Sequence, residues 1–114
     1  MGPSGDTVAR AREHCLRQYA SCADECERAL EGLRDEPSSR ELRNELIVCA
    51  AVCRVAARAL GDGNRIAGAL VEYSVEICRR CAKQVGDAEL PDRDAVVGAC
   101  TDTAEAAATL LLIV

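Results

Sequence analysis

Apolar residues recur along this chain in steps of three and four, which is the periodicity of an amphipathic α-helix. In the second predicted helix the inward positions are Leu42, Leu46, Cys49, Cys53, Ala56 and Leu60. The same steps continue at Ala67, Val71, Ser74, Cys78, Cys81 and Val85, and again at Val97, Cys100, Ala104, Ala107, Leu111 and Val114. The pattern predicts a succession of helices, each with one inward stripe.

Turn and capping residues divide this pattern into four helices, at about 7–33, 39–60, 64–86 and 92–113, after a flexible start at 1–6. Asp6 or Thr7 can cap the first helix, and the Glu36-Pro37 pair ends it. Ser38 and Glu41 form a capping box for the second helix. Short turns between helices of similar length predict an all-α, antiparallel up-down-up-down four-helix bundle in a single domain over 7–114.

Cysteine stands at many of the inward positions. Cys15, Tyr19, Cys22 and Cys26 fall on one stripe of the first helix, and Cys49, Cys53, Cys78, Cys81 and Cys100 lie on the stripes of the others. With a rise of ~1.5 Å per residue and alternating helix directions, seven of these sulfurs fall in a slab roughly 15 Å deep. Cys15 lies some ~10 Å below it. The rest of the core is apolar and is filled by Leu60, Ala67, Leu70, Val71, Leu110 and Leu111.

Composition narrows the function. The chain has 114 residues, eight of them cysteine, with no Trp or Phe and a net charge of −5. Acids and arginines are interspersed, so the sequence shows neither the basic patch of a nucleic-acid binder nor a membrane anchor. The N-terminus lacks the basic and apolar regions of a secretory signal, which predicts a cytoplasmic protein with reduced thiols. In that setting a set of buried cysteines favours metal binding over disulfides.

Thiolates clustered inside a helical bundle suit a soft metal. Cu(I) accepts an all-sulfur site with two or three ligands and bridging thiolates, so we expect several Cu(I) ions. Zinc remains a possible metal in place of copper, although it usually takes four ligands on loops. The predicted metal ligands are Cys22, Cys26, Cys49, Cys53, Cys78, Cys81, Cys100 and Cys15.

Other interpretations stay open. Free cysteine is also a good small core residue, so the chain could be a metal-free interaction bundle. A redox-active copper-thiolate or thiol catalyst is a further alternative, but Cys78 and Cys81 lie mid-helix and no catalytic motif is present, which leans against an enzyme. His14 is simplest as a surface residue, while Tyr19 and Ser74 are packed hydroxyls or donors to a nearby thiolate.

Several segments resemble the cysteine-rich four-helix-bundle copper storage proteins of the Csp type. They are Cys22-x3-Cys26, the stretch from Cys49 to Leu60, and Glu76-Ile-Cys78-Arg-Arg-Cys81-Ala-Lys. The chain is similar to a cysteine-depleted member, because its fourth helix keeps only Cys100. The resemblance implies a bundle core lined with thiolates that hold Cu(I), hence a protein that sequesters or buffers copper. A copper-delivering chaperone is then a candidate partner.

The C-terminal run from Thr109 to Val114 is apolar on all sides. A helix in a monomeric bundle needs only one apolar stripe, so part of this apolar surface is not needed for packing within its own chain. The run is too short to span a membrane. It predicts a homodimer, or a tetramer built from it, that associates through the fourth helix.

Overall fold

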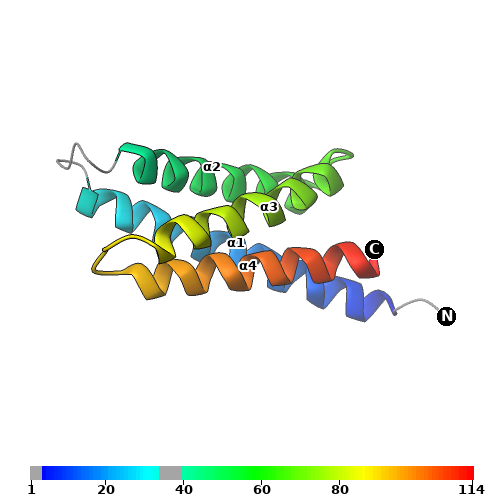
Figure 1. Cartoon of the computed structure of the whole chain (residues 1–114). Helices are drawn as coiled ribbons and strands as arrows, with labels where there is room; N and C mark the ends of the chain where they lie inside the picture. Colours follow the sequence, from blue (N-terminus) through cyan, green and yellow to red (C-terminus); the bar gives the residue numbers. More distant parts are fainter. Residues whose placement is uncertain (1–3, 34–39) are drawn as a thin grey trace.

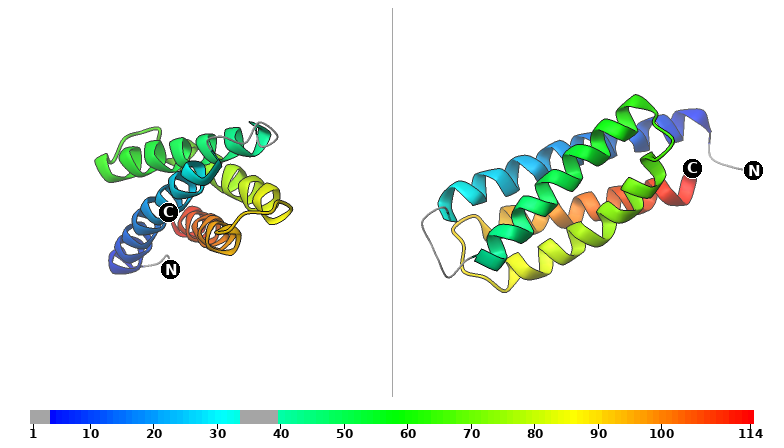
Figure 2. Two further views of the ribbon diagram at one scale, coloured as in Figure 1. Left: turned by 90° about the vertical axis from the view of Figure 1, so that its left-hand side faces the viewer. Right: turned by 90° about the horizontal axis from the view of Figure 1, so that it is seen from above.

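The computed structural model describes residues 4–33 and 40–114. Over these residues the chain forms four helices and no strand: α1 (Gly5–Leu33), α2 (Arg40–Asp62), α3 (Ala67–Gly86) and α4 (Arg93–Ile113). The helices alternate in direction, so the start of α1 and the end of α4 lie at the same end of the bundle (Figure 1). Each helix packs against its neighbour in the chain, and α1 closes the ring against α4 (Figure 2). The predicted up-down-up-down four-helix bundle is confirmed.

The first helix begins earlier than the sequence predicted. Ser4 is the capping residue, because its Oγ accepts a hydrogen bond from the amide of Thr7 at 3.2 Å. The prediction that Asp6 or Thr7 caps α1 was therefore wrong, and Gly5 and Asp6 are helical. The predicted helix end at Glu36-Pro37, and Ser38 of the predicted capping box, lie outside the described residues.

The turn after α2 is fixed by backbone geometry. Gly63 has a φ of 67°, the left-handed conformation that glycine adopts most easily. The amide of Asn64 then reaches back to the carbonyl of Ala59 at 2.9 Å. Arg12 of α1 donates to two further carbonyls at the end of α2, at 2.9 and 3.0 Å. The C-terminus of α2 is thus capped by its own turn and tied to α1.

The third helix begins later than expected, at Ala67 and not at Asn64. The Asn64 side chain accepts a hydrogen bond from the amide of Ile66 at 3.0 Å, and its carbonyl accepts one from the amide of Ala67 at 3.0 Å. These bonds hold residues 64–66 in a turn, because an Asn side chain near its own backbone competes with helical pairing.

The core follows the predicted stripes on α3, where all six inward positions are buried. On α2 the stripe is buried from Leu46 to Ala56, and its two ends are half-buried. On α4 the stripe is shifted. Its buried residues are Val96, Cys100, Thr103, Ala104, Ala106, Ala107 and Leu110. Val97 and Leu111 are only half-buried, and Val114, predicted to point inward, is 77% exposed.

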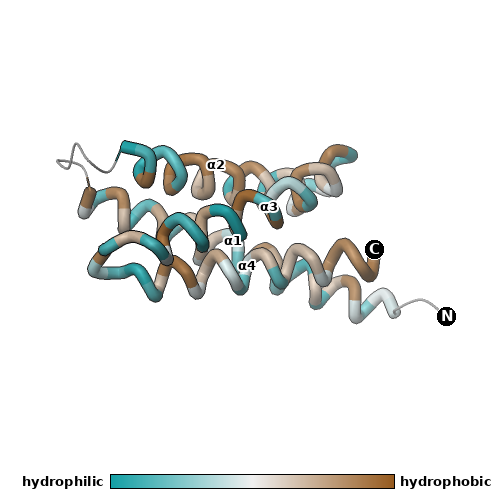
Figure 3. The backbone as a smooth tube through the Cα atoms, in the orientation of Figure 1, coloured by the Kyte–Doolittle hydropathy of each residue, from teal (hydrophilic) through white to brown (hydrophobic). Residues whose placement is uncertain are grey.

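The fourth helix is also the most apolar one, as its colour in Figure 3 shows. Within the described part of the chain it alone is long and apolar enough, by length and composition, to cross a membrane. Core helices of soluble proteins pass the same test, and α4 packs along both α1 and α3. Only 39% of its most apolar window is buried, and Leu112 at its end is 86% exposed. The helix therefore presents apolar surface that its own bundle does not cover.

Candidate metal centre

All four helices contribute cysteines to the interior. The pairs Cys22 and Cys26 on α1 and Cys49 and Cys53 on α2 are one turn apart, so each pair shares one helix face. On α3 and α4 the inward sulfurs are Cys78, Cys81 and Cys100. We call these seven residues the thiol cluster. Together with Cys15 they are free thiols with no exposed surface.

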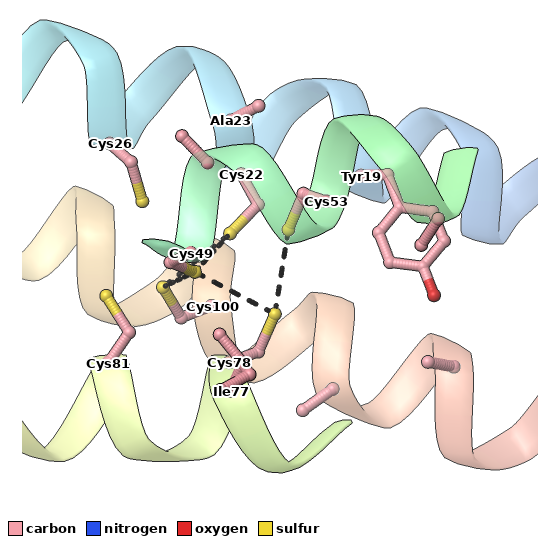
Figure 4. Close-up of a cluster of buried hydrophobic side chains, with 14 of the residues drawn as sticks. Tyr19, Cys22, Ala23, Cys26, Cys49, Cys53, Ile77, Cys78, Cys81 and Cys100 are labelled. Atoms are coloured by element: carbon pink, nitrogen blue, oxygen red, sulfur yellow. Dashed lines mark hydrogen bonds between the residues drawn. The ribbon is translucent and has the colours of Figure 1, made fainter. Parts of the chain in front are cut away.

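The sulfur atoms lie in contact with one another across the helices. The Sγ atom of Cys22 is 3.6 Å from that of Cys100 and 3.8 Å from that of Cys49. The Cys49 and Cys100 sulfurs are 3.9 Å apart, which joins α2 to α4. On the α3 side, Cys78 is 3.7 Å from Cys53 and 4.0 Å from Cys49 (Figure 4). The contacts form one continuous chain of sulfurs and not separate pairs.

Two groups of four sulfurs are compact enough to hold an ion. One comprises Cys22, Cys26, Cys49 and Cys100, and the other Cys22, Cys49, Cys53 and Cys78. Within each group all sulfurs lie within 4.8 Å of one another. In the described part of the chain these are the only such groupings of His, Cys, Asp and Glu. Because Cys22 and Cys49 belong to both groups, ions held in them would share bridging ligands.

Cys81 belongs to neither group, but it borders the first. It interacts with Cys100, Cys26 and Cys49. Figure 4 shows Cys26 and Cys81 at the end of the thiol cluster that is farther from Tyr19. The structure therefore brings together all seven of the cysteines that the helical rise had placed in one slab.

Cys15 is buried but stands apart from the thiol cluster. It is in neither group of four sulfurs, and its polar neighbour is the hydroxyl of Tyr19. The Tyr19 Oη atom lies 2.6 Å from Ser74 Oγ, and Ser74 donates to the carbonyl of Val71 at 2.6 Å. Both of these hydroxyl side chains are fully buried. Burial raises the pKa of the Cys15 thiol and of the Tyr19 phenol, so both stay neutral at physiological pH.

Mutual contact shifts the pKa values of the clustered thiols in opposite directions. Contact with Cys100 is the main cause of the lowered pKa of Cys22 and of Cys81. The pKa of Cys100 and that of Cys53 are both raised, chiefly by contact with Cys22. Negative charge on one sulfur opposes charge on its neighbours, so without a cation the seven thiols do not all ionise.

Among residues 4–33 and 40–114, no cationic side chain offsets that charge from within the core. Of the residues described, the buried polar side chains are Ser74 and Thr103, and neither bears a charge. His14 is exposed, and Asp24 and Glu27 on the outer face of α1 pair with Arg54 of α2. Buried anions need a partner, so protons or bound metal ions must neutralise the thiol cluster.

The sulfur spacing agrees with a metal-thiolate site. An ion with tetrahedral bonds of ~2.3 Å to four sulfurs has sulfur–sulfur edges of about 3.8 Å. The shortest contacts, 3.6 to 4.0 Å, bracket that length, and the other sulfurs of each group lie within 4.8 Å. The side chains must therefore draw slightly closer together to close on an ion.

Comparison with known proteins points to one family. The model of the copper storage protein (Csp) family matches residues 6–112. Among solved structures, the chain is similar to the Cu(I)-bound copper storage protein BsCsp3, with a TM-score of 0.82 and 18% sequence identity. The alignment covers 89% of this chain and 98% of that one. At this identity the structural match establishes the shared fold. No match was found among curated proteins.

Proposed function

The chain belongs to the copper storage protein family, and on that premise we propose that it binds Cu(I) inside the bundle and so sequesters or buffers copper. The observation that carries this proposal is the pair of overlapping sulfur groups, which share Cys22 and Cys49. Shared thiolates let several soft ions occupy a small volume, since each bridging sulfur serves two ions. Analysis of metal in protein purified without chelator tests the proposal.

The proposed ligands are the seven residues of the thiol cluster. Six of them belong to the two groups of sulfurs, and Cys81 borders the first group. Cys15 was also a candidate ligand in the sequence, but it belongs to neither group of sulfurs and we leave it out of this set. With two or three thiolates per ion and bridging, seven thiolates hold about four Cu(I) ions.

Zinc is the competing metal, because the sulfur spacing suits a tetrahedral thiolate site as well. Family membership and the bridging arrangement favour copper. A competition experiment separates the two. Zinc-loaded protein should release its zinc when Cu(I) is added, and the reverse exchange should fail. Zinc that stays bound against Cu(I) would make this a zinc protein.

The second alternative is a redox catalyst that uses the thiols or a copper-thiolate cluster. Reactive thiols are usually accessible and often lie at a helix N-terminus, whereas every cysteine here is buried and Cys78 and Cys81 lie within α3. We therefore expect that copper-loaded protein does not turn over an added reductant with oxygen.

The third alternative is a metal-free bundle in which cysteine only fills the core. In that case all eight thiols would react in protein that is unfolded after exposure to copper.

We place the protein in the cytoplasm, since eight unpaired thiols persist best in a reducing compartment. Buried ligands also favour delivery of copper by another protein, so a copper-delivering chaperone is the proposed donor. Fractionation of cells that express the tagged protein tests the location, and copper transfer from a loaded donor tests the partner.

A second copy of the chain is the proposed cover for the exposed face of α4. A groove between α3 and α4 is lined by apolar Val75, Ala108, Leu111 and Leu112, with Glu72, Glu76 and Arg79 beside them. Because the groove carries both acids and an arginine, a two-fold contact offers an opposite charge to each. Light scattering on metal-free protein should show a dimer, or a tetramer built from it. A monomer that assembles only with copper would refute this interface.

A further inference from the structure

The sulfur array stops abruptly in the middle of the bundle. On α1 the stripe continues one turn beyond Cys22 as Tyr19, and on α3 it continues one turn beyond Cys78 as Ser74. Neither Tyr19 nor Ser74 has any exposed surface. A hydroxyl pair thus occupies the layer where two further inward sulfurs would extend the array.

This pair spans the bundle from α1 to α3, and we call it the hydroxyl bar. Tyr19 Oη and Ser74 Oγ are 2.6 Å apart and come from α1 and α3, which face each other across the ring of helices. Ser74 donates its hydroxyl proton to the carbonyl of Val71, so the Tyr19 hydroxyl donates to Ser74. Each hydroxyl therefore has a fixed partner, and no buried side-chain nitrogen or oxygen in the described residues is left without one.

The other two helices leave room for the tyrosine ring. One turn beyond Cys53 on α2 stands Ala56, and one turn beyond Cys100 on α4 stands Ala104. Both alanines are buried. The helical rise places them at the level of Tyr19, so the large ring of α1 fills space that small residues leave. This layer contains no sulfur.

Cys15 lies on the far side of the hydroxyl bar. It is fully buried and interacts with the Tyr19 hydroxyl, and it belongs to neither group of sulfurs. Two turns of α1, about 10 Å, separate it from Cys22. A bridging thiolate must contact both of its ions, so an ion in the cluster cannot share Cys15 across this layer.

We propose that the Tyr19–Ser74 pair is the boundary of the copper site: it ends the thiolate array, excludes Cys15 and sets how many ions the bundle holds. The inference rests on the proposed function. A hydroxyl is a hard donor that Cu(I) binds poorly, so the pair interrupts the site chemically, while the ring blocks it by volume. Capacity is then fixed by one layer of the core and not by the number of cysteines alone.

The test counts Cu(I) ions bound by four reduced proteins: wild type, Cys15→Ala, Tyr19→Cys/Ser74→Cys, and the latter with Cys15→Ala. We expect Cys15→Ala to leave the wild-type count unchanged. The double cysteine variant should bind roughly 1.4-fold more copper, since ten thiols become continuous where seven were. In that background Cys15→Ala should lower the count, because Cys15 is then a ligand.

The boundary is refuted if Cys15→Ala lowers the wild-type count, or if Tyr19→Cys/Ser74→Cys binds no more copper than wild type while circular dichroism shows a folded bundle. Wild type that binds no copper at all would instead refute the proposed function. Tyr19→Phe/Ser74→Ala keeps the bulk of the layer without its hydroxyls, and its count should match wild type. If the double cysteine variant does not fold, the number of Cu(I) ions bound by Cys15→Ala still tests whether the boundary excludes Cys15.

Discussion

The two halves of this bundle are built on the same helical stripes but differ in what fills them. One half holds the thiol cluster. The other, which we call the apolar half, is packed by Ala56, Ala59, Ala67, Val71, Ala107 and Leu110. Both are buried to a similar degree, because cysteine is a small side chain that packs like an aliphatic one. Replacing hydrocarbon with sulfur at these positions changes the chemistry of the core without changing its architecture.

The comparison separates stability from function. In the apolar half a residue stabilises the fold through the apolar surface that it buries. In the thiol cluster a residue also packs in the core, but in addition it is one of several ligands of a common metal site, and Cys22 and Cys49 belong to both groups of sulfurs. Substitutions in the two halves should therefore have opposite signatures, one in metal capacity and the other in unfolding free energy.

The largest effect should follow from removing the two shared sulfurs. We expect Cys22→Ala/Cys49→Ala to lose at least half of its bound Cu(I), and to lose cooperative filling, because both groups of sulfurs then lack two members. Each substitution leaves a small cavity and costs about 1 to 2 kcal/mol, so the bundle should still fold. Titration with a chromophoric Cu(I) competitor measures the loss.

Cys15→Ala is the matched control for this variant, since it removes an equally buried thiol outside both groups. Single Cys49→Ala and Cys53→Ala variants should each cost more copper than Cys15→Ala does. If Cys15→Ala proves as damaging as Cys53→Ala, the separation between Cys15 and the thiol cluster does not govern metal binding.

The reverse signature is expected in the apolar half. Leu110 is 3% exposed, and Leu110→Ala should lower the free energy of unfolding by about 2 to 5 kcal/mol through lost burial and a cavity. The number of bound Cu(I) ions should not change. Urea unfolding of metal-free protein and a copper titration of the same variant check both parts. A drop in copper count would show that the halves are coupled.

A smaller effect concerns pH and comes chiefly from the thiol cluster. The pKa values of Cys53 and Cys100 are raised in the fold from an ordinary value of 9.0. A raised folded pKa adds stability below the unfolded pKa that is lost as pH rises above it. Metal-free protein should thus become less stable above about pH 9, whereas copper-loaded protein, whose cluster thiolates are already formed, should lose less, through Cys15 and Tyr19 only. Parallel urea titrations at pH 7 and pH 10 test this. Equal losses in both forms would contradict it.

The smallest effect is expected outside both halves. Leu112 is 86% exposed, so Leu112→Ala should change the unfolding free energy of the single bundle by less than about 0.5 kcal/mol. It is the matched control for Leu110→Ala, two positions away on the same helix. A loss comparable to that of Leu110→Ala, at concentrations where the protein is monomeric, would mean that Leu112 is covered within its own chain.

The sequence predicted some of these features better than others. The stripe of α3 was assigned correctly because polar residues flank it on both sides and fix its phase. The stripe of α4 was misassigned at Val114 because its alanines make nearly every face apolar, so periodicity cannot decide which face is inward. Burial of Thr103 was missed for a related reason. Its hydroxyl bonds to the carbonyl of Ala99 one turn before it and to that of Gln18 on α1, and the long-range partner Gln18 cannot be seen in a sequence.

The candidate site was easier to foresee than the boundary that limits it. Helical rise alone placed the seven sulfurs in one slab, since the distance between residues on a helix is fixed. The same arithmetic named Tyr19 and Ser74 as stripe residues. It could not show that their hydroxyls meet at 2.6 Å across the bundle, because that contact depends on the packing of α1 against the others.

Stepwise titration of fully reduced, metal-free protein with Cu(I) tests whether the thiol cluster acts as one copper site. Bound copper is counted against a competitor while unreacted thiols are counted in parallel. We predict cooperative filling to about four ions, with the same number of ions in Cys15→Ala, whose seven remaining thiols all belong to the thiol cluster. Binding of a single ion, or steady filling to a dozen or more, would contradict it.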